Sequence, residues 1–308
     1  MNKGTPEEVT LRYSKRGMTL LKEYLQKDYC KRAAEKLLQA PKGNVLITTG
    51  FYVAGYAETD GPMGTLAVAK ALEGLGYHGI VITDKYCEGF FELKDISVEY
   101  VAINADPSVY EEILAKYRPV YMISIERCGH NLENEYANMR GDSITGQTAC
   151  IDTLFELAAQ KKIPTIGVGD GGNEIGMGNV RQVILEKLEL NPCVVTVDDL
   201  IIATTSNWGA YALAAYMAKL SGRPVFITYE EIEEYMAQIV ALGCVDGVTK
   251  QKKMGTDGFS MEIEKEIITS LKEAIAWHFM QSPLAVHDKY FWWFSGQNEC
   301  RYYRLRDD

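Results

Sequence analysis

Six glycines and two carboxylates lie within twelve residues, 167–178, which read Gly-Val-Gly-Asp-Gly-Gly-Asn-Glu-Ile-Gly-Met-Gly. An apolar run typical of a strand, 163–168, leads into this stretch. Glycine lets a backbone turn sharply and approach a ligand closely, at an entropic cost that an ordinary loop avoids. Asp170 and Glu174 offer the oxygen ligands that hard divalent cations prefer. The stretch therefore predicts a loop that holds a metal ion or a polar small molecule.

The same stretch contains the pattern Gly-x-Gly-x-x-Gly over residues 167–172, which is also the fingerprint of dinucleotide-binding loops. Asp170 and Glu174 would repel a pyrophosphate bound there. Asp198 and Asp199, however, end the next strand-like run, where an acid suited to ribose recognition is expected. A nucleotide-dependent enzyme that uses residues 167–172 therefore stays open as an alternative, as does a purely structural glycine turn.

Composition excludes several classes of protein. The 308 residues are 47% hydrophobic and 24% charged, enough for a large core, and the formal net charge is −10. A net-acidic surface does not attract nucleic acid or an anionic membrane over long range, and no apolar run approaches the roughly 18 residues of a membrane span. Seven scattered cysteines without a Cys-x-x-Cys pair, and a start without signal or transit character, predict a cytoplasmic protein with reduced thiols.

Short β-branched runs alternate with helical segments along the chain. The pattern predicts strands at 45–49, 80–83, 98–103, 120–125, 165–168, 194–197 and 225–227, and helices at 66–75, 107–116, 148–160, 180–188 and 210–220. This alternation favours a single α/β domain over residues 1–308, built as a Rossmann-like three-layer sandwich around a parallel sheet. Residues 1–42 are interpreted as a helical N-terminal extension, and 261–308 as a C-terminal helix and an aromatic tail.

In such a sheet, ligands bind at the carboxyl ends of the strands. Polar residues gather there: Asp60 follows the first strand-like run, Glu126 and Arg127 the fourth, and Ser206 and Asn207 the sixth. Each also has a structural interpretation, as a turn residue, an ion pair or helix caps respectively. Their shared position at strand ends nevertheless favours a site.

Six strings occur in a fixed order along the chain. They are 58–67 (Glu-Thr-Asp-Gly-Pro-Met-Gly-Thr-Leu-Ala), 124–131 (Ser-Ile-Glu-Arg-Cys-Gly-His-Asn), 136–142 (Tyr-Ala-Asn-Met-Arg-Gly-Asp), 167–179, 206–210 (Ser-Asn-Trp-Gly-Ala) and 245–249 (Val-Asp-Gly-Val-Thr). Together they resemble the C-terminal domain of D-glutamate cyclase, so residues 43–260 are interpreted as the family-like core of a stand-alone version of that domain. The resemblance implies a hydro-lyase that converts D-glutamate into 5-oxo-D-proline and water, with manganese or magnesium as the metal and no organic cofactor.

Cyclisation of glutamate requires a neutral α-amine and a γ-carboxylate whose charge has been neutralised. We expect Asp60, Asp170 and Glu174 to ligate the metal, with Glu126 and Asp170 as catalytic residues and Glu126 as the base. A planar guanidinium binds a carboxylate through two parallel hydrogen bonds, and a loop bounded by two Asp-Gly turns could close over the site. The expected substrate-binding residues are Arg127, Arg140, Asn173, Ser206, Asn207, Asp246 and Lys250.

The expected partner is a small acidic amino acid as substrate, with no nucleic acid and no membrane. A non-catalytic protein that binds an acidic amino acid is a further alternative. Because full-length cyclases carry an additional N-terminal domain, a separately encoded partner is also expected as one route to activity. Residues 290–294 are five consecutive aromatics, which predicts that the tail is buried, either against its own domain or in a homodimer.

Overall fold

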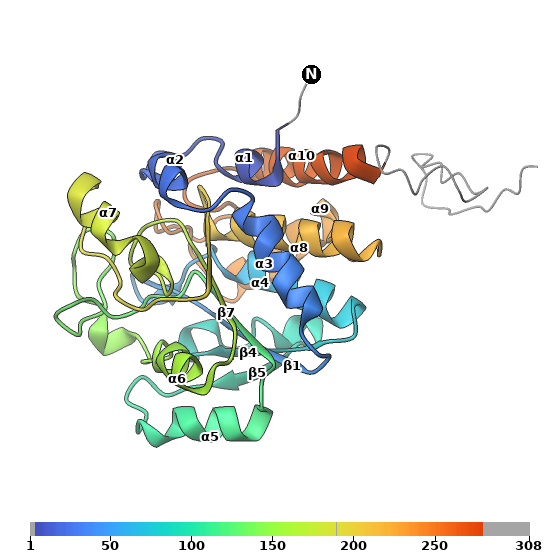
Figure 1. The fold of residues 1–308 in the computed structure, drawn as a ribbon. Helices are drawn as coiled ribbons and strands as arrows, with labels where there is room; N and C mark the ends of the chain where they lie inside the picture. Colours follow the sequence, from blue (N-terminus) through green and yellow to red (C-terminus); the bar gives the residue numbers. More distant parts are fainter. Residues whose placement is uncertain (1–3, 189, 280–308) are drawn as a thin grey trace, which may run out of the picture.

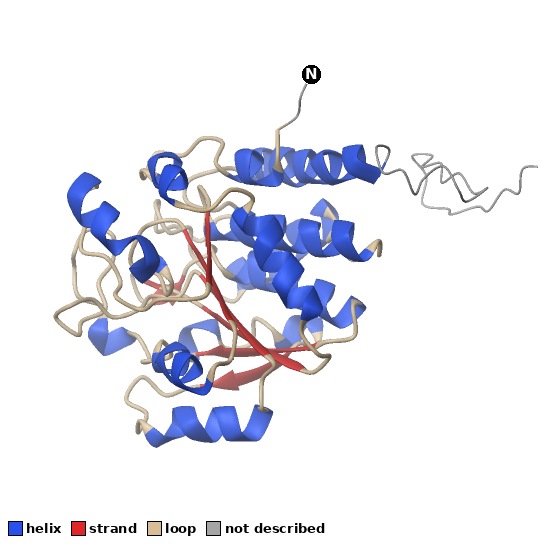
Figure 2. Ribbon diagram, viewed as in Figure 1, coloured by secondary structure: helices blue, strands red, loops and turns tan. Residues whose placement is uncertain are grey.

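A six-stranded parallel sheet lies at the centre of residues 4–188 and 190–279, which the computed structural model describes (Figure 2). Its order, β5-β4-β1-β6-β7-β8, is third, second, first, fourth, fifth and sixth along the chain, the strand order of Rossmann folds. The predicted fold class is therefore confirmed. The strands are β1 (Asn44–Thr49), β4 (His78–Thr83), β5 (Ser97–Tyr100), β6 (Tyr121–Ile125), β7 (Thr165–Gly169) and β8 (Asp199–Ile202).

Helices cover both faces of this sheet (Figure 1). One face carries α3 (Tyr29–Gln39), α4 (Pro62–Gly74) and α8 (Ser206–Ser221), and the other carries α5 (Ser108–Tyr117) and α6 (Thr153–Lys161). Outside α8 lie α1 (Pro6–Thr10) and α10 (Met261–Phe279), and α9 (Tyr229–Ala241) packs on α10 and α4. The remaining elements include α2 (Met18–Leu21), α7 (Arg181–Lys187) and a small hairpin of β2 (Tyr52–Val53) and β3 (Tyr56–Ala57).

The central strands are apolar on both sides because helices cover both faces. Every residue of β6 and β7 is buried, and so are all residues of β1 after Asn44. Helix α8 is buried from Ser206 to Ala218, because α3 and α4 flank it and α10 covers it. Parallel sheets with this double cover read as near-continuous apolar runs in the sequence. The main hydrophobic cluster contains residues from Val9 to Ile275, and a small second cluster contains Phe51, Cys128, Tyr136 and Ile144.

Two predicted strands are wrong. Residues 194–197 are irregular, and the sixth strand is β8 instead. The run supports the glycine-rich loop: Val195 O accepts from Gly176 N and Gly178 N, while the Asn179 side chain binds both backbone groups of Val197. Residues 225–227 are also irregular, directly after a proline, which cannot donate to a sheet.

The predicted aromatic tail, residues 290–294, lies outside the described residues. Within the described part of the chain, no helix has the length and apolar character needed to cross a membrane.

Candidate active site at the carboxyl edge of the sheet

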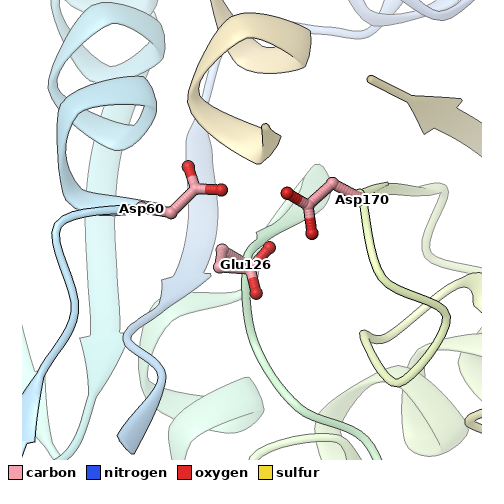
Figure 3. A group of neighbouring side chains, drawn as sticks. All are labelled: Asp60, Glu126 and Asp170. Atoms are coloured by element: carbon pink, nitrogen blue, oxygen red, sulfur yellow. The ribbon is translucent and has the colours of Figure 1, made fainter. Parts of the chain in front are cut away.

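Three buried carboxylates meet at the centre of the sheet's carboxyl edge. Asp60, Glu126 and Asp170 each bring one oxygen within 4.8 Å of the others (Figure 3). Asp60 lies in the connection from β1 to α4, Glu126 follows β6 and Asp170 follows β7. Because β1, β6 and β7 are adjacent parallel strands, their ends deliver the three acids to one point next to the switch in strand order. We call this group the three-acid cluster.

Burial and mutual repulsion disfavour the charged forms of the three acids, and a bound cation would relieve both effects. Burial, with the nearby charge of Asp257, raises the pKa of Asp60 to about 8. Burial and the charges of Glu174 and Asp60 raise the pKa of the Glu126 carboxyl well above its usual range. Burial likewise raises the pKa of Asp170, although the Arg16 guanidinium opposes this shift. Three buried oxygen donors of this kind fit a hard divalent cation, so the cluster could hold a metal ion.

Asp60 is held by the start of α8. Its Oδ2 accepts from Ser206 N at 2.8 Å and its Oδ1 from Asn207 N at 2.7 Å. In return, Asn207 Oδ1 accepts from Gly61 N at 2.9 Å and Gly64 N at 2.8 Å, in the first turn of α4. Each helix therefore has amide groups of its first turn capped by a side chain from the start of the other. We call this arrangement the reciprocal cap.

Ser206 and Asn207 were expected to bind substrate, but both are fully buried and neither lines the cavity described below. The Ser206 hydroxyl donates to Glu126 Oε2 at 2.6 Å. Glu126 itself has φ +47°, a left-handed backbone conformation that few non-glycine residues adopt. The two α8 residues thus position the acids of the cluster.

Glu174 organises the glycine-rich loop. Its Oε1 accepts from Gly171 N at 2.6 Å and its Oε2 from Gly172 N at 2.7 Å, and Gly172 has a φ of +104° that a side chain would strain. Both carboxylate oxygens of Glu174 therefore accept from backbone amides, as those of Asp60 also do. Glu174 was also expected to ligate the metal, but the group of acids whose oxygens lie close enough to hold an ion contains Asp170 and does not include Glu174.

The same contacts weigh against the nucleotide alternative. In a dinucleotide-binding loop the backbone N–H groups bind pyrophosphate, but here Glu174 occupies them. The two candidate ribose acids also lie away from this edge, because Asp199 begins β8 and Asp198 accepts from Thr165 N, at the start of β7. Asp198 and Asp199 thus lie at the amino edge of the sheet, opposite the loop. The two acids that kept the nucleotide alternative open therefore do not lie beside the glycine-rich loop.

Arg127 is buried, 1% exposed, and is paired within the protein. Its Nη1 contacts Asp84 Oδ2 at 2.7 Å and donates to Gly50 O at 2.8 Å, while its Nη2 donates to Ala149 O at 2.8 Å. The guanidinium that was expected to clamp a substrate carboxylate therefore joins the ends of β1 and β4 to the segment before α6. It does not line the cavity.

A cavity of about 200 Å³ opens in front of the cluster. Four acids and three cations line it, and two of the cations, Arg140 and Lys250, are exposed at its mouth. Of the expected site residues, Glu126, Asp170, Asn173, Arg140 and Lys250 line this cavity, whereas Asp60, Arg127, Glu174, Ser206, Asn207 and Asp246 do not. The lining acids are Glu58, Glu126, Asp170 and Asp257, and the lining cations are Arg16, Arg140 and Lys250.

The loop formed by residues 245–259 closes one side of the cavity. Asp246 is fully buried and accepts from Thr249 N and Gly258 N, each at 2.7 Å, so it shapes this loop. A Cβ atom on Gly247 would collide with the Glu58 carboxylate, so the loop packs directly against that acid. Asp246, expected to bind substrate, instead positions the loop that carries Lys250 and Asp257.

Three charged residues that line the cavity were not among the site residues expected from the sequence. Glu58 lies two residues before Asp60 in a string that had been singled out, and Asp257 lies in an Asp-Gly turn, so both had a detectable signal. Arg16 had no detectable signal, because it lies in the N-terminal stretch that the sequence pattern predicts only as a helical extension.

The fold and site define a Rossmann-like α/β protein with a buried acidic cluster at its switch point. The chain belongs to the D-glutamate cyclase-like, C-terminal family, whose family model matches residues 9–272. The human mitochondrial D-glutamate cyclase is 32% identical over 205 residues, which are 56% of this chain and 32% of that protein. The chain thus matches about a third of the length of this relative.

Solved structures show weaker likenesses. UDP-glucose 4-epimerase from Brucella ovis in complex with NAD is 16% identical, with 59% of this chain and 49% of that chain covered and a TM-score of 0.29. The Bordetella bronchiseptica enzyme WbmH in complex with NAD⁺ is 13% identical, with 59% and 54% covered and a TM-score of 0.30. The fold assignment depends on the strand order and not on these likenesses.

Proposed function

We propose that this protein converts D-glutamate into 5-oxo-D-proline and water with the help of a divalent metal ion. The observation that carries the proposal is the two-sided charge of the cavity, with buried carboxylates at its base and cations at its mouth. An amino acid with a second carboxylate matches both sides, because its ammonium group is attracted to acids and its carboxylates to cations. Membership of the D-glutamate cyclase-like family supports the same substrate.

Asp60, Glu126 and Asp170 are the residues that would hold the ion, proposed to be manganese or magnesium. A bound divalent ion supplies positive charge that makes a carboxylate easier to attack. The reciprocal cap and the Ser206–Glu126 hydrogen bond hold two of the three acids in place, so the donor set is preorganised.

The reaction requires two protons to move. The substrate's ammonium nitrogen loses two protons and forms a bond to the γ-carbon, and one γ-carboxylate oxygen leaves with those protons as water. Glu126, expected as the base, accepts from Ser206 and belongs to the three-acid cluster. Glu58 lines the same cavity outside the three-acid cluster, and we assign its carboxylate to carry a proton from the nitrogen to the leaving oxygen.

The exposed cations complete the proposed site. Arg140 lies at the cavity mouth, and we assign it to one substrate carboxylate, with Lys250 on the loop formed by residues 245–259 as a second, less directional partner. Asn173 lines the cavity while its amide nitrogen donates to Ala137 O at 2.7 Å. Its side-chain oxygen is therefore the group proposed to orient the substrate amine.

The test is turnover by the purified protein, followed by NMR detection of 5-oxoproline. D-glutamate with manganese should be converted, whereas chelation of the metal, or the substitution Glu126→Gln, should abolish conversion. L-glutamate under the same conditions tests stereochemistry. Binding of D-glutamate without conversion would overturn the catalytic proposal and favour the acidic-amino-acid-binding alternative.

A separately encoded partner is proposed as a further requirement, since the chain matches only 32% of the human relative. Conversion that begins only when the unmatched part of such a relative is added would establish it. A homodimer is also proposed, with light scattering as its test. A cytoplasmic location stays a prediction, and the human relative is named as mitochondrial.

A further inference from the structure

Residues 11–17, which connect α1 to α2, form a strap across the end of β8. Thr204, two residues after β8, donates its N–H to Thr10 O at 2.9 Å and its hydroxyl to Arg12 O at 2.7 Å. The Tyr13 ring packs at 6.0 Å from Phe259 and 6.5 Å from Trp208, and its hydroxyl donates to Glu266 Oε2 at 2.9 Å. The strap is therefore anchored to the sheet edge, α8, α10 and the loop formed by residues 245–259.

Arg16 extends from this strap into the acidic cavity. Its Nη1 lies 2.9 Å from Asp170 Oδ2 and 2.8 Å from Asp257 Oδ2, and both carboxylates are almost fully buried. Within the described part of the chain, no other cation forms an ion pair with these two acids. Both contacts use the same nitrogen, and the side chain remains 24% exposed where it lines the cavity. The guanidinium therefore still has N–H donors for a ligand.

Asp170 is a candidate ligand of the metal ion, as a member of the three-acid cluster, and also the ion-pair partner of Arg16. A divalent cation at the cluster would repel the Arg16 guanidinium. It would also bind the Asp170 carboxylate and so weaken the attraction of this carboxylate for Arg16. Metal ion and Arg16 therefore compete for Asp170, whereas Asp257 lies outside the cluster and can keep its contact.

We propose that Arg16 is shared between the protein and its ligand. In the metal-free site it neutralises Asp170 and Asp257; when a divalent ion occupies the three-acid cluster, its released N–H groups bind a carboxylate of the amino-acid ligand. This inference rests on the proposed function for the class of ligand. Its consequence is a coupling between the two sites, in which metal strengthens ligand binding and the ligand strengthens metal binding by the same factor.

The first experiment titrates manganese into the full chain by calorimetry, without any amino acid. Arg16→Gln removes the competing cation, so manganese should bind on the order of tenfold more tightly than in the parent. Lys15→Gln is the matched control, because it removes the same charge from an exposed neighbour on the same strap and should leave affinity unchanged. Unchanged or weaker manganese binding by a folded Arg16→Gln protein would overturn the inference.

The second experiment titrates D-glutamate at saturating manganese. Arg16→Gln should bind it at least about tenfold more weakly, which is the opposite direction from its effect on manganese. Arg16→Lys keeps the charge but loses the planar fork, so manganese affinity should stay near the parent value while D-glutamate affinity falls. Should Arg16→Gln fail to fold, Arg16→Lys decides, and a parent-like D-glutamate affinity overturns the inference.

The two proposals fail separately. Suppose that Arg16→Gln binds manganese more tightly and D-glutamate more weakly, while the parent does not form 5-oxoproline. That result would contradict the proposed reaction and support the role of Arg16. Normal conversion of D-glutamate by Arg16→Gln, with a parent-like Michaelis constant, would support the proposed reaction and contradict the role of Arg16. A parent protein that binds no D-glutamate at all would remove the ligand half of the inference.

Discussion

The two edges of the sheet both carry aspartates beside a cavity, but their charges are arranged differently. At the amino edge, Asp198 accepts from Thr165 N and Oγ1, and Asp199 lies 2.7 Å from Lys36 Nζ. The cavity there, about 630 Å³, is larger than the one at the carboxyl edge. Cavity volume alone would favour the amino edge as the functional site. The excess of buried acids over cations favours the carboxyl edge as the functional site. At the amino edge, Asp198 and Asp199 already have partners within the protein and are less available to a ligand.

The sharpest way to break this comparison is to neutralise one acid at each edge. Asp170→Asn keeps the shape but removes a ligand, so manganese affinity and turnover should fall by on the order of a hundredfold or more. Asp198→Asn should leave both unchanged and cost about 1–2 kcal/mol of unfolding free energy, since it weakens the bonds from Thr165. Calorimetry and urea denaturation measure the two effects. Equal losses of manganese affinity would remove the distinction between the edges.

Arg127 and Arg140, both expected to bind a substrate carboxylate, should differ next most in the effect of substitution by lysine. Arg127→Lys should lower the free energy of unfolding by about 3 kcal/mol, because Asp84 and two buried carbonyls lose part of their partner. Arg140→Lys, at an exposed position on the cavity, should leave stability unchanged and raise the Michaelis constant for D-glutamate. Urea denaturation and steady-state kinetics separate the outcomes. Parent-like stability in Arg127→Lys would contradict the structural role.

Glu174 and Asp170 test the comparison within a single loop. Glu174→Gln keeps one good acceptor for the amides of Gly171 and Gly172, so we expect a loss of about 1–3 kcal/mol in stability. Manganese affinity should fall much less than in Asp170→Asn, because the metal loses no direct ligand. If the two variants lose manganese equally, Glu174 belongs in the metal shell.

His130 and Asp152 form a partnered pair near the site, and they should give the smallest effect. Their hydrogen bond, at 2.7 Å, raises the pKa of His130 above its usual value, so the folded state favours the charged ring. The resulting stabilisation is fully present below the unfolded pKa of about 6.5 and is lost as pH rises through the folded pKa. For this partly exposed ring it should stay below about 1 kcal/mol. Unfolding curves at pH 5.5 and 8.5 should differ less in His130→Gln than in the parent; identical pH dependence would refute the role.

The sequence predicts the sheet well because covered parallel strands leave a strong signal. Runs such as 45–49 and 120–125 consist mostly of apolar residues and are bounded by helical segments. The run 194–197 has the same composition but serves a loop, and only the tertiary contacts of Gly176 and Asn179 separate the two cases.

The site is less predictable because residue type does not reveal which way a side chain is directed. Glu126 and Arg127 are adjacent and charged, yet the left-handed backbone at Glu126 sends one towards the cavity while the other is buried against Asp84. Asp170 and Glu174 share a loop, and the turn at Gly172 decides which of them binds amides. Arg16 reaches the cavity only through the packing of a strap from the far end of the chain.

The reciprocal cap links local unfolding at two distant places in the sequence. The amides of Gly61 and Gly64 depend on Asn207, and the amides of Ser206 and Asn207 depend on Asp60. Neither helix can fray at its first turn without releasing the other, so the four amides open to solvent as one cooperative unit. A change that loosens α8, even on its face towards α3, thereby reaches Asp60 of the three-acid cluster through the amides of Ser206 and Asn207, and the start of α4 through the Asn207 side chain.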